Sequence, residues 1–242
     1  MRVAVISDIH GNLHALEAVL ADVRSQAPDE TWCLGDVVGY GPSPNECCDL
    51  VRESASLALV GNHDLAAIGA LSTEDFTPLA LLSAEWTAAA LSPDRADWLR
   101  SLAPEAARDG FELYHGSPRD PVWEYVLSEE VALLCIHDTK APVVLVGHSH
   151  LALALAWDGR ALDGGLAPAG TEIALAGRRY LINPGSVGQP RDGDPRAAWL
   201  LVDVEAGRGT FRRVPYPVER TQAEMRERGL PDALAARLAD GV

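Results

Sequence analysis

The chain has 242 residues, 48% of them hydrophobic, so it has the length and composition of a globular protein with a substantial core. Its 35 acidic residues outnumber its 20 basic residues, and the formal charge of −15 argues against binding to duplex nucleic acid. Because the amino terminus lacks the apolar core of a signal peptide and no apolar run approaches the span of a membrane helix, we expect a soluble cytoplasmic protein with no membrane partner.

The first quarter of the chain alternates apolar runs with helical patterns. Strand-then-helix pairs are predicted at 2–7 with 12–26, at 31–36 with 44–54, and at 57–62 with the residues that follow. Asn12 is placed to cap the first of these helices. A repeated order of strand, polar turn and helix is typical of an α/β domain with parallel strand pairing.

The middle of the chain, from residue 65 to about 108, is rich in Ala and Leu and is interrupted by Pro78 and Pro93. This pattern predicts several helices packed on or beside the sheet. Strands return at 111–116, 142–150, 151–157, 178–185, 196–205 and 209–216, and a helix is predicted over 217–228 with one more after it. Tight turns join these later strands, so this half is expected to be more antiparallel, and a single domain over residues 1–242 is predicted.

The four cysteines are Cys33, Cys47, Cys48 and Cys135. They show no C-x-x-C pairing, and two of them are adjacent, which suits neither a zinc knuckle nor an ordinary disulfide. We therefore expect reduced thiols with structural roles.

Polar side chains follow five of the predicted strands, at the point where each strand ends. They are Asp8, His10, Asp36, Asn62, His63, His115, His148 and His150. In open α/β sheets, ligands gather beyond the carboxyl ends of the strands, so these eight side chains are expected at one edge of the sheet.

The spacing and chemistry of these residues indicate a metal site. Asp8 and His10 are two residues apart, as are His148 and His150, and in an extended segment each pair would point to the same side. Oxygen and imidazole ligands without sulfur suit Mn, Fe, Ni or Zn, whereas Ca would require more carboxylates. Because there are more ligands than one ion needs, two ions sharing a carboxylate are the economical interpretation.

The order of the polar blocks carries a family resemblance. The segments are SDIHGN, GDVVGYGP, GNHD, LYHGSP and GHSH, in that order, and the match runs from residue 3 to about residue 190. Together they resemble the successive motifs of the calcineurin-like metallophosphoesterase superfamily, and within it the small bacterial and archaeal phosphodiesterase branch. The resemblance implies a four-layer α/β/β/α sandwich with mixed sheets and a dinuclear metal site at one end.

The resemblance also implies a role for each matched residue. The metal ligands would be, for one ion, Asp8, His10 and His150, and for the other, Asn62, His115 and His148. Asp36 would bridge the two ions. His63 would not bind metal but would face the substrate, with Asp64 holding its ring.

The expected cofactors are two divalent transition-metal ions, with Mn the first choice and Fe, Ni or Zn as alternatives. Two such ions lower the pKa of a shared water and clamp the phosphoryl oxygens, so a metal-bridging hydroxide is the expected nucleophile. Their positive charge would supply what this acidic protein otherwise lacks. His63 could stabilise the equatorial oxygens or protonate the leaving alkoxide.

The resemblance favours a metal-dependent hydrolase of phosphoester bonds, and above all a phosphodiesterase for small or nucleotide-like substrates. Phosphoprotein phosphatases and their diadenosine tetraphosphatase relatives place an arginine before the glycine of the second block, where this chain has GDVVGYGP. Phosphatases for phosphomonoesters, phosphoproteins or dinucleoside polyphosphates stay as alternatives, as does a non-enzymatic metal-binding scaffold. The intact ligand set favours an enzyme, and the sequence leaves a homo-oligomer open.

Several residues outside the metal set have two interpretations each. Arg119, just after HGSP, and Arg191 could approach a substrate phosphate or could simply be exposed. His14 and His137 fall in predicted helices outside the motif blocks, and we expect both to be structural.

Aromatic residues raise the same question. Tyr40 could contact substrate, although a packed tyrosine is favoured. The apolar residues between 76 and 102, including Trp86 and Trp98, could cover a pocket or form a dimer surface, but core packing is the stronger expectation.

Overall fold

The computed structural model describes residues 1–242 and is built around two six-stranded sheets. In pairing order, the strands of the first sheet are β3 (Leu57–Ala58), β2 (Glu30–Cys33), β1 (Arg2–Ile6), β11 (Ala197–Asp203), β12 (Arg208–Val214) and β9 (Glu172–Ala174). Those of the second sheet are β4 (Glu105–Arg108), β5 (Phe111–Tyr114), β6 (Val143–Val146), β10 (Arg179–Pro184), β7 (Ala152–Trp157) and β8 (Leu162–Leu166). Both sheets contain parallel and antiparallel pairs.

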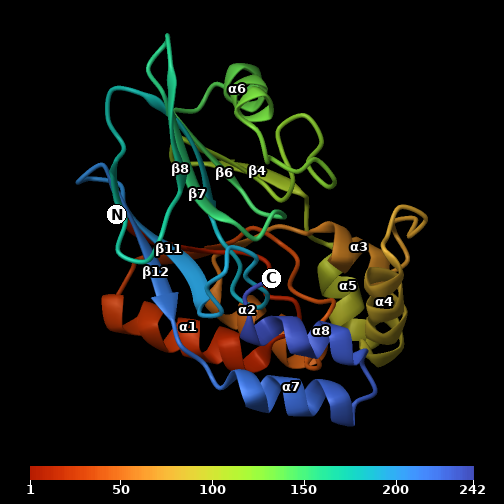
Figure 1. Cartoon of the computed structure of the whole chain (residues 1–242). Helices are drawn as coiled ribbons and strands as arrows, with labels where there is room; N and C mark the ends of the chain where they lie inside the picture. The colour runs from red at the N-terminus through yellow and green to blue at the C-terminus, as the bar shows by residue number, and fades with distance from the viewer.

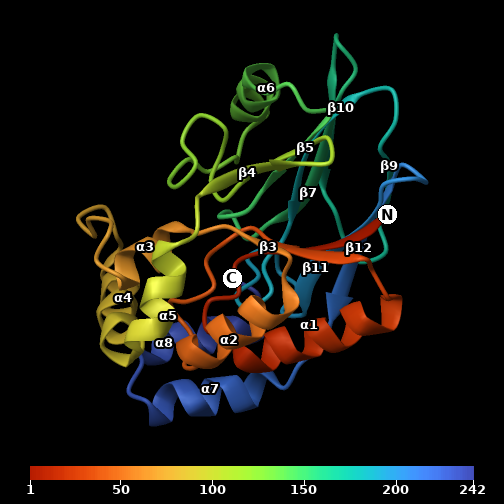
Figure 2. The same cartoon turned by 180° about the vertical axis from the view of Figure 1, so that it is seen from behind.

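Helices cover the outer face of each sheet and one end of the sandwich (Figures 1 and 2). They are α1 (Leu13–Gln26), α2 (Pro44–Ser54), α3 (Asn62–Ala67), α4 (Pro78–Ala90), α5 (Pro93–Arg100), α6 (Glu129–Asp138), α7 (Val218–Glu227), α8 (Asp232–Ala236) and the short 3-10 helix η1 (Arg237–Ala239). In Figure 1, α1 lies below the first sheet and α6 lies above the second. The predicted four-layer α/β/β/α sandwich with mixed sheets is therefore confirmed.

Side chains that alternate along the strands divide the core into layers. On β1, Val3 and Val5 point between the two sheets, where they share a cluster with Leu113 of β5. Ala4 and Ile6 point to the other side and pack against α1 and α2. Because both faces of β1 are buried, its sequence is a continuous apolar run and not an alternating one.

Asn12 joins three segments that are far apart in the sequence. Its Oδ1 atom accepts the backbone N–H of Ala15 at 3.2 Å, so it caps α1 as predicted. The same oxygen accepts the Thr221 hydroxyl of α7 at 3.1 Å, and Nδ2 donates to the Gly188 carbonyl at 2.8 Å. With 1% of its surface exposed, Asn12 is a buried polar link between α1, α7 and the loop after β10.

Three strands were not predicted, namely β4, β8 and β9. The first of these changes the prediction for residues 65 to about 108, because the last helix there ends at Arg100 and residues 105–108 form an edge strand. This strand pairs antiparallel with β5, from Glu105 opposite Tyr114 to Arg108 opposite Phe111. Pairing with a neighbouring strand therefore outweighs the helical preference of its two central alanines.

The second half of the chain is more antiparallel than the first, as expected. The neighbours β7 and β8, β7 and β10, and β11 and β12 all pair antiparallel. The exceptions are β5 with β6 and β6 with β10, which pair in parallel. Helix α6 connects β5 to β6, so the parallel pairing there follows from a helical crossover.

Other expectations from the sequence concern single residues. All four cysteines are buried and unpaired, as predicted. His14 on α1 lies 2.9 Å from the Glu224 carboxylate, and His137 on α6 packs edge-on against Trp157, which agrees with structural roles for both. None of the helices has both the length and the apolar composition needed to cross a membrane.

We expect Asn12→Ala to lower the free energy of unfolding by about 2–4 kcal/mol, because it removes a helix cap and leaves the buried Gly188 carbonyl without its donor. Urea denaturation followed by circular dichroism measures this change. Ser25→Ala near the other end of α1, where the hydroxyl is exposed, is the control and should change the free energy by less than about 0.5 kcal/mol. A similarly small effect of Asn12→Ala would show that this residue does not link the segments energetically.

Candidate metal centre

The eight polar residues predicted at strand ends converge at one end of the two sheets. They lie in the loops after β1, β2, β5 and β6 and at the start of α3. None of the eight exposes more than 6% of its surface. Asp8 and Asp36 come from the first sheet and His115 and His148 from the second, so the cluster exists only because the sheets meet here.

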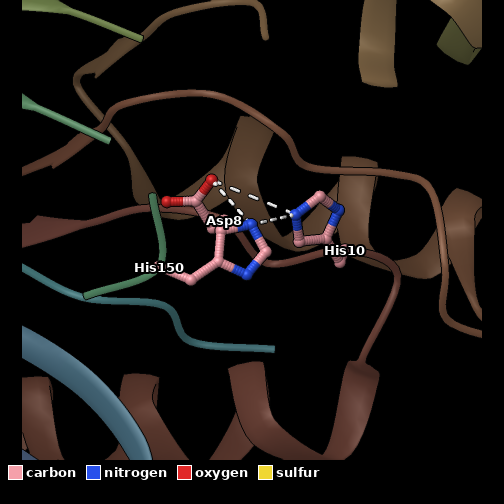
Figure 3. A group of neighbouring side chains, drawn as sticks. All are labelled: Asp8, His10 and His150. Carbon is pink, nitrogen blue, oxygen red and sulfur yellow. Dashed lines mark hydrogen bonds and ion pairs between the residues drawn. The ribbon is translucent and has the colours of Figure 1, made fainter. Parts of the chain in front are cut away.

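The first group of ligand atoms belongs to Asp8, His10 and His150 (Figure 3). The Oδ1 atom of Asp8 lies 3.4 Å from Nε2 of His150 and 3.9 Å from Nε2 of His10. The two imidazole Nε2 atoms are 2.9 Å apart. These three side chains therefore direct one oxygen and two nitrogens toward the same small volume.

The second group contains Asp36, His115 and His148, whose ligand atoms lie within 4.8 Å of one another. Oδ2 of Asp36 is 3.4 Å from Nε2 of His115, and Asn62 places its Oδ1 atom 3.2 Å from the same nitrogen. Asp36 also reaches the first group, because its Oδ2 atom is 3.6 Å from Nε2 of His10. One carboxylate oxygen thus lies between the two groups.

Backbone carbonyl groups orient the imidazole rings. The Nδ1–H groups of His10, His115 and His150 donate to the carbonyl oxygens of Val38, Leu34 and Gln189 at 3.2, 2.9 and 2.6 Å. Because a carbonyl only accepts, Nδ1 carries the hydrogen in these three rings, and each Nε2 faces the cluster. His148 is turned the other way, with Nε2 at 3.2 Å from the Trp123 carbonyl, which leaves its Nδ1 atom for the cluster.

The donor set fits divalent transition-metal ions. With hydrogen on Nδ1, the neutral rings of His10 and His150 direct their Nε2 lone pairs at each other across 2.9 Å. The buried Oδ2 atoms of Asp8 and Asp36 have no hydrogen-bond partner. Buried acceptors without a donor or cation are unfavourable, and nitrogen and oxygen ligands without sulfur are those that Mn, Fe, Ni and Zn accept.

Burial controls the charges in the cluster. It holds the pKa of His10 and of His150 well below the usual value and lowers the pKa of His148 to about 3. Burial opposes the ionisation of Asp36, but the adjacent His115 outweighs it and holds the pKa of this carboxyl well below its usual value. Burial also opposes the charged form of His115, but the adjacent Asp36 outweighs it and raises the pKa of His115 to about 9. Three neutral imidazoles and an ionised Asp36 suit metal binding, whereas His115 has to lose a proton before its Nε2 atom can bind an ion.

Five of the cluster residues have a left-handed backbone conformation. The φ angles are 53° at Asp8, 50° at His10, 51° at Asp36, 63° at His148 and 60° at His150. The segments are therefore not extended, and the prediction that alternation along a strand brings each pair together is wrong. Left-handed geometry costs on the order of 1 kcal/mol or more per non-glycine residue, so the surrounding packing has to hold these loops in place.

Asp64 has a different role from the one expected. Its carboxylate accepts the backbone N–H groups of Val38 at 2.9 Å and Gly61 at 3.0 Å. Nδ1 of His63 is buried without a hydrogen-bond partner, so the expected contact between Asp64 and the His63 ring is absent. Asp64 instead closes the first turn of α3 and ties it to the loop after β2.

A pocket of about 430 Å³ opens beside His63 and Asn62. Arg191 and Tyr40 both line it, and the ring centroids of Tyr40 and His63 are 4.4 Å apart. Arg119 does not line the pocket but pairs with Glu124 at 3.5 Å, so of the two candidate arginines only Arg191 faces this space.

The pocket also has walls that the sequence did not indicate. Among the aromatic residues between 76 and 102, Phe76 lines the pocket, whereas Trp86 and Trp98 pack in the apolar clusters under α4 and around α1. Trp123, Tyr125 and Arg237 line it as well. The last three lie outside the five motifs, in connecting loops and in η1, and no periodicity or motif marks them.

Comparisons with known proteins agree with this geometry. Residues 1–207 match the calcineurin-like phosphoesterase superfamily domain. A metallophosphoesterase from Sphaerobacter thermophilus, known from its crystal structure, is 44% identical, with 100% of this chain and 99% of that chain covered and a TM-score of 0.90. An uncharacterized protein from Methanocaldococcus jannaschii is 34% identical over 98% of this chain and 96% of its own length.

A more distant relative carries a functional name. The symmetrical bis(5′-nucleosyl)-tetraphosphatase of Thioalkalivibrio sulfidiphilus is 30% identical over 165 residues. The match covers 62% of this chain and 55% of that protein, so this chain spans only about half of its length.

Proposed function

We propose that this chain, which belongs to the calcineurin-like phosphoesterase superfamily, is a phosphodiesterase that hydrolyses small or nucleotide-like diesters with two divalent metal ions. One observation carries the proposal: Asp36 lies between two groups of metal-ligand atoms, and a pocket large enough for a small organic substrate opens at Asn62 and His63 of the same cluster. The combination supports a hydrolytic centre with a place for a substrate beside it.

The proposed metal ligands follow the two groups. They are Asp8, His10 and His150 for one ion and Asn62, His115 and His148 for the other. Asp36 would contact both ions. Bound divalent ions would supply Lewis-acid charge that activates water and stabilises phosphoryl oxygens, and Mn is proposed, with Fe, Ni or Zn as alternatives.

His63 is the proposed catalytic residue of the chain itself. Its ring packs against those of Tyr40 and Phe76, with centroid distances of 4.4 and 4.9 Å, and it lines the pocket next to Asn62. A substrate held there would present a phosphoryl or leaving-group oxygen to this imidazole. Asp64 would act as a positioning residue, because it fixes the turn that carries His63.

The pocket supports a preference for diesters. A diester has an organic group on each side of phosphorus, and the aromatic side chains of the pocket offer a surface for the group that a monoester lacks. A monoester also brings nearly two negative charges into a protein of formal charge −15. The distant tetraphosphatase relative supports the nucleotide-like part of the proposal.

Asp36→Asn is expected to remove both metal ions, because a neutral amide cannot bridge two cations as a carboxylate does. Asp8→Asn is the matched control and should weaken only one of the two positions, since Asp8 belongs to a single group. Elemental analysis of the purified proteins gives the number of ions per chain, and circular dichroism checks that both variants fold. If Asp36→Asn bound two ions with unchanged affinity, Asp36 would not be the bridge.

His63→Ala should reduce turnover by about 10²–10⁴-fold while the metal content stays at the wild-type level. His137→Ala is the control, because this histidine is exposed on α6 and packs against Trp157 away from the cluster. Steady-state kinetics and metal analysis on the same preparations separate the outcomes. Loss of metal together with activity would make His63 a ligand, and unchanged turnover would remove it from the mechanism.

The third expectation concerns substrate choice. With Mn supplied, kcat/KM for bis(p-nitrophenyl) phosphate should exceed that for p-nitrophenyl phosphate, and both substrates release the same leaving group. A clearly higher value for the monoester would overturn the phosphodiesterase assignment in favour of a phosphatase. Hydrolysis of neither ester by protein that carries two ions would favour a non-enzymatic metal-binding scaffold.

A further inference from the structure

The pocket beside His63 has an aromatic wall. Phe76 packs against the His63 ring at 4.9 Å and meets Trp123 edge-on at 5.5 Å. Tyr125 stacks on the His148 ring at 3.8 Å and leaves 42% of its surface exposed. Aromatic rings thus pack against two imidazoles of the cluster. Exposed aromatic side chains stack on flat aromatic groups, and any nucleobase can stack in this way.

Two guanidinium groups line the same pocket, Arg191 and Arg237. Arg191 donates to the side-chain oxygen of Gln189 at 2.9 Å, and its Nε atom is buried without a partner. Arg237 donates through Nε to an oxygen of Val242, the last residue of the sequence. Neither forms an ion pair with an Asp or Glu side chain, although the chain has 35 acidic residues.

The two guanidinium groups are close enough to affect each other. Burial, together with the positive charge of Arg191, lowers the pKa of Arg237. Arg191 also lies over the Tyr40 ring, with its Cζ atom 5.8 Å from the centroid. Two neighbouring guanidinium groups without an Asp or Glu partner favour an anion, and arginine favours phosphate through paired N–H donors.

These walls come from parts of the chain outside the motif blocks. Phe76 precedes α4 and Trp123 follows β5, whereas Arg237 begins η1, beyond the residues 1–207 that match the superfamily domain. The pocket therefore combines these three side chains with residues of the GDVVGYGP and GNHD blocks. Asp75 also lines the pocket and adds one acceptor there.

We propose that this pocket binds the part of the substrate beyond the reacting phosphorus, with a nucleobase-type ring against Phe76 and Trp123 and a second phosphate on Arg191 and Arg237. The substrate class is then a nucleotide derivative that carries a phosphate other than the one being hydrolysed. The inference rests on the proposed function, because that function places the reacting phosphorus at the metal-ligand cluster. The volume of about 430 Å³ falls in the range of small-molecule sites.

Calorimetry on the metal-loaded protein tests the binding part with three ligands. We expect thymidine 3′,5′-bisphosphate to bind about tenfold more tightly than thymidine 5′-phosphate, which lacks the second phosphate, and than the abasic deoxyribose bisphosphate, which lacks the ring. Arg237→Gln should abolish only the advantage that the second phosphate gives, and Trp123→Ala should abolish only the advantage that the ring gives. Trp123→Phe should restore most of the ring effect, which separates stacking from a folding defect.

Kinetics provides the second measurement. The p-nitrophenyl ester of thymidine 5′-phosphate should gain about tenfold in kcat/KM when it carries a 3′-phosphate, and Arg237→Gln should remove this gain. Arg228→Gln makes the same charge change at an exposed arginine of the same segment and should leave the gain intact.

The outcomes of the proposed function and of this inference are distinguishable. If bis(p-nitrophenyl) phosphate is not hydrolysed but the calorimetric differences appear, the phosphodiesterase proposal fails and the binding pocket stands. If the simple diester is hydrolysed but the three ligands bind alike, or if Arg237→Gln weakens all three equally, the inference is overturned.

Discussion

The carboxylate of Asp36 lies where the ends of the two sheets meet, and the rest of the site is arranged around it. Its Oδ2 atom faces His10 at 3.6 Å and His115 at 3.4 Å, and its Oδ1 atom accepts the His63 backbone N–H at 2.9 Å. Because the carboxylate is fully buried, it requires donors or cations, and the His63 N–H supplies one donor to Oδ1 whereas Oδ2 has no hydrogen-bond partner and is open to a cation. A side chain on Gly61 would overlap Asp36, so this position of the GNHD motif requires glycine.

Close packing of the loops explains the backbone conformations around Asp36. A Cβ on Gly11 would lie 2.9 Å from the Gly41 carbonyl oxygen, and one on Gly188 would overlap the Ile9 carbonyl. Because the loops are this close, few backbone conformations direct the polar side chains into the cluster. The ligand positions have left-handed φ angles, which do so. The sheets and the buried hydrogen bonds hold the loops in this strained conformation. The ligand atoms are therefore already close together before a ligand binds.

The pocket next to the cluster depends on another kind of interaction, the apolar packing of the last helices. Met225 of α7 and Leu234 of α8 pack in one apolar cluster with Ala80 of α4 and with Tyr40. This packing places η1 so that Arg237 lines the same pocket as His63. The cluster consists of residues of the superfamily motifs, and the pocket joins Asn62 and His63 of those motifs to side chains from connecting loops and the carboxy-terminal segment. The proposed hydrolysis and the proposed substrate recognition thus use adjacent parts of the structure that share Asn62 and His63.

The sequence by itself determined the local features of this protein. Periodicity and capping signals located most strands and helices, the Asn12 cap included, because they depend on neighbouring residues. The polar residues at strand ends were predicted at one edge of a single sheet, but they come from two sheets, so their meeting depends on how the sheets pack. Only the tertiary structure decided the edge strand β4, the hydrogen bonds of Asp64, and the walls formed by Trp123, Tyr125 and Arg237. The hairpin of β4 with β5 and the bonds of Asp64 to the loop after β2 depend on tertiary packing that overrides local preference, although the partners are near in sequence. The pocket combines residues from 40 to 237, and contacts over such separations leave no local pattern in the chain.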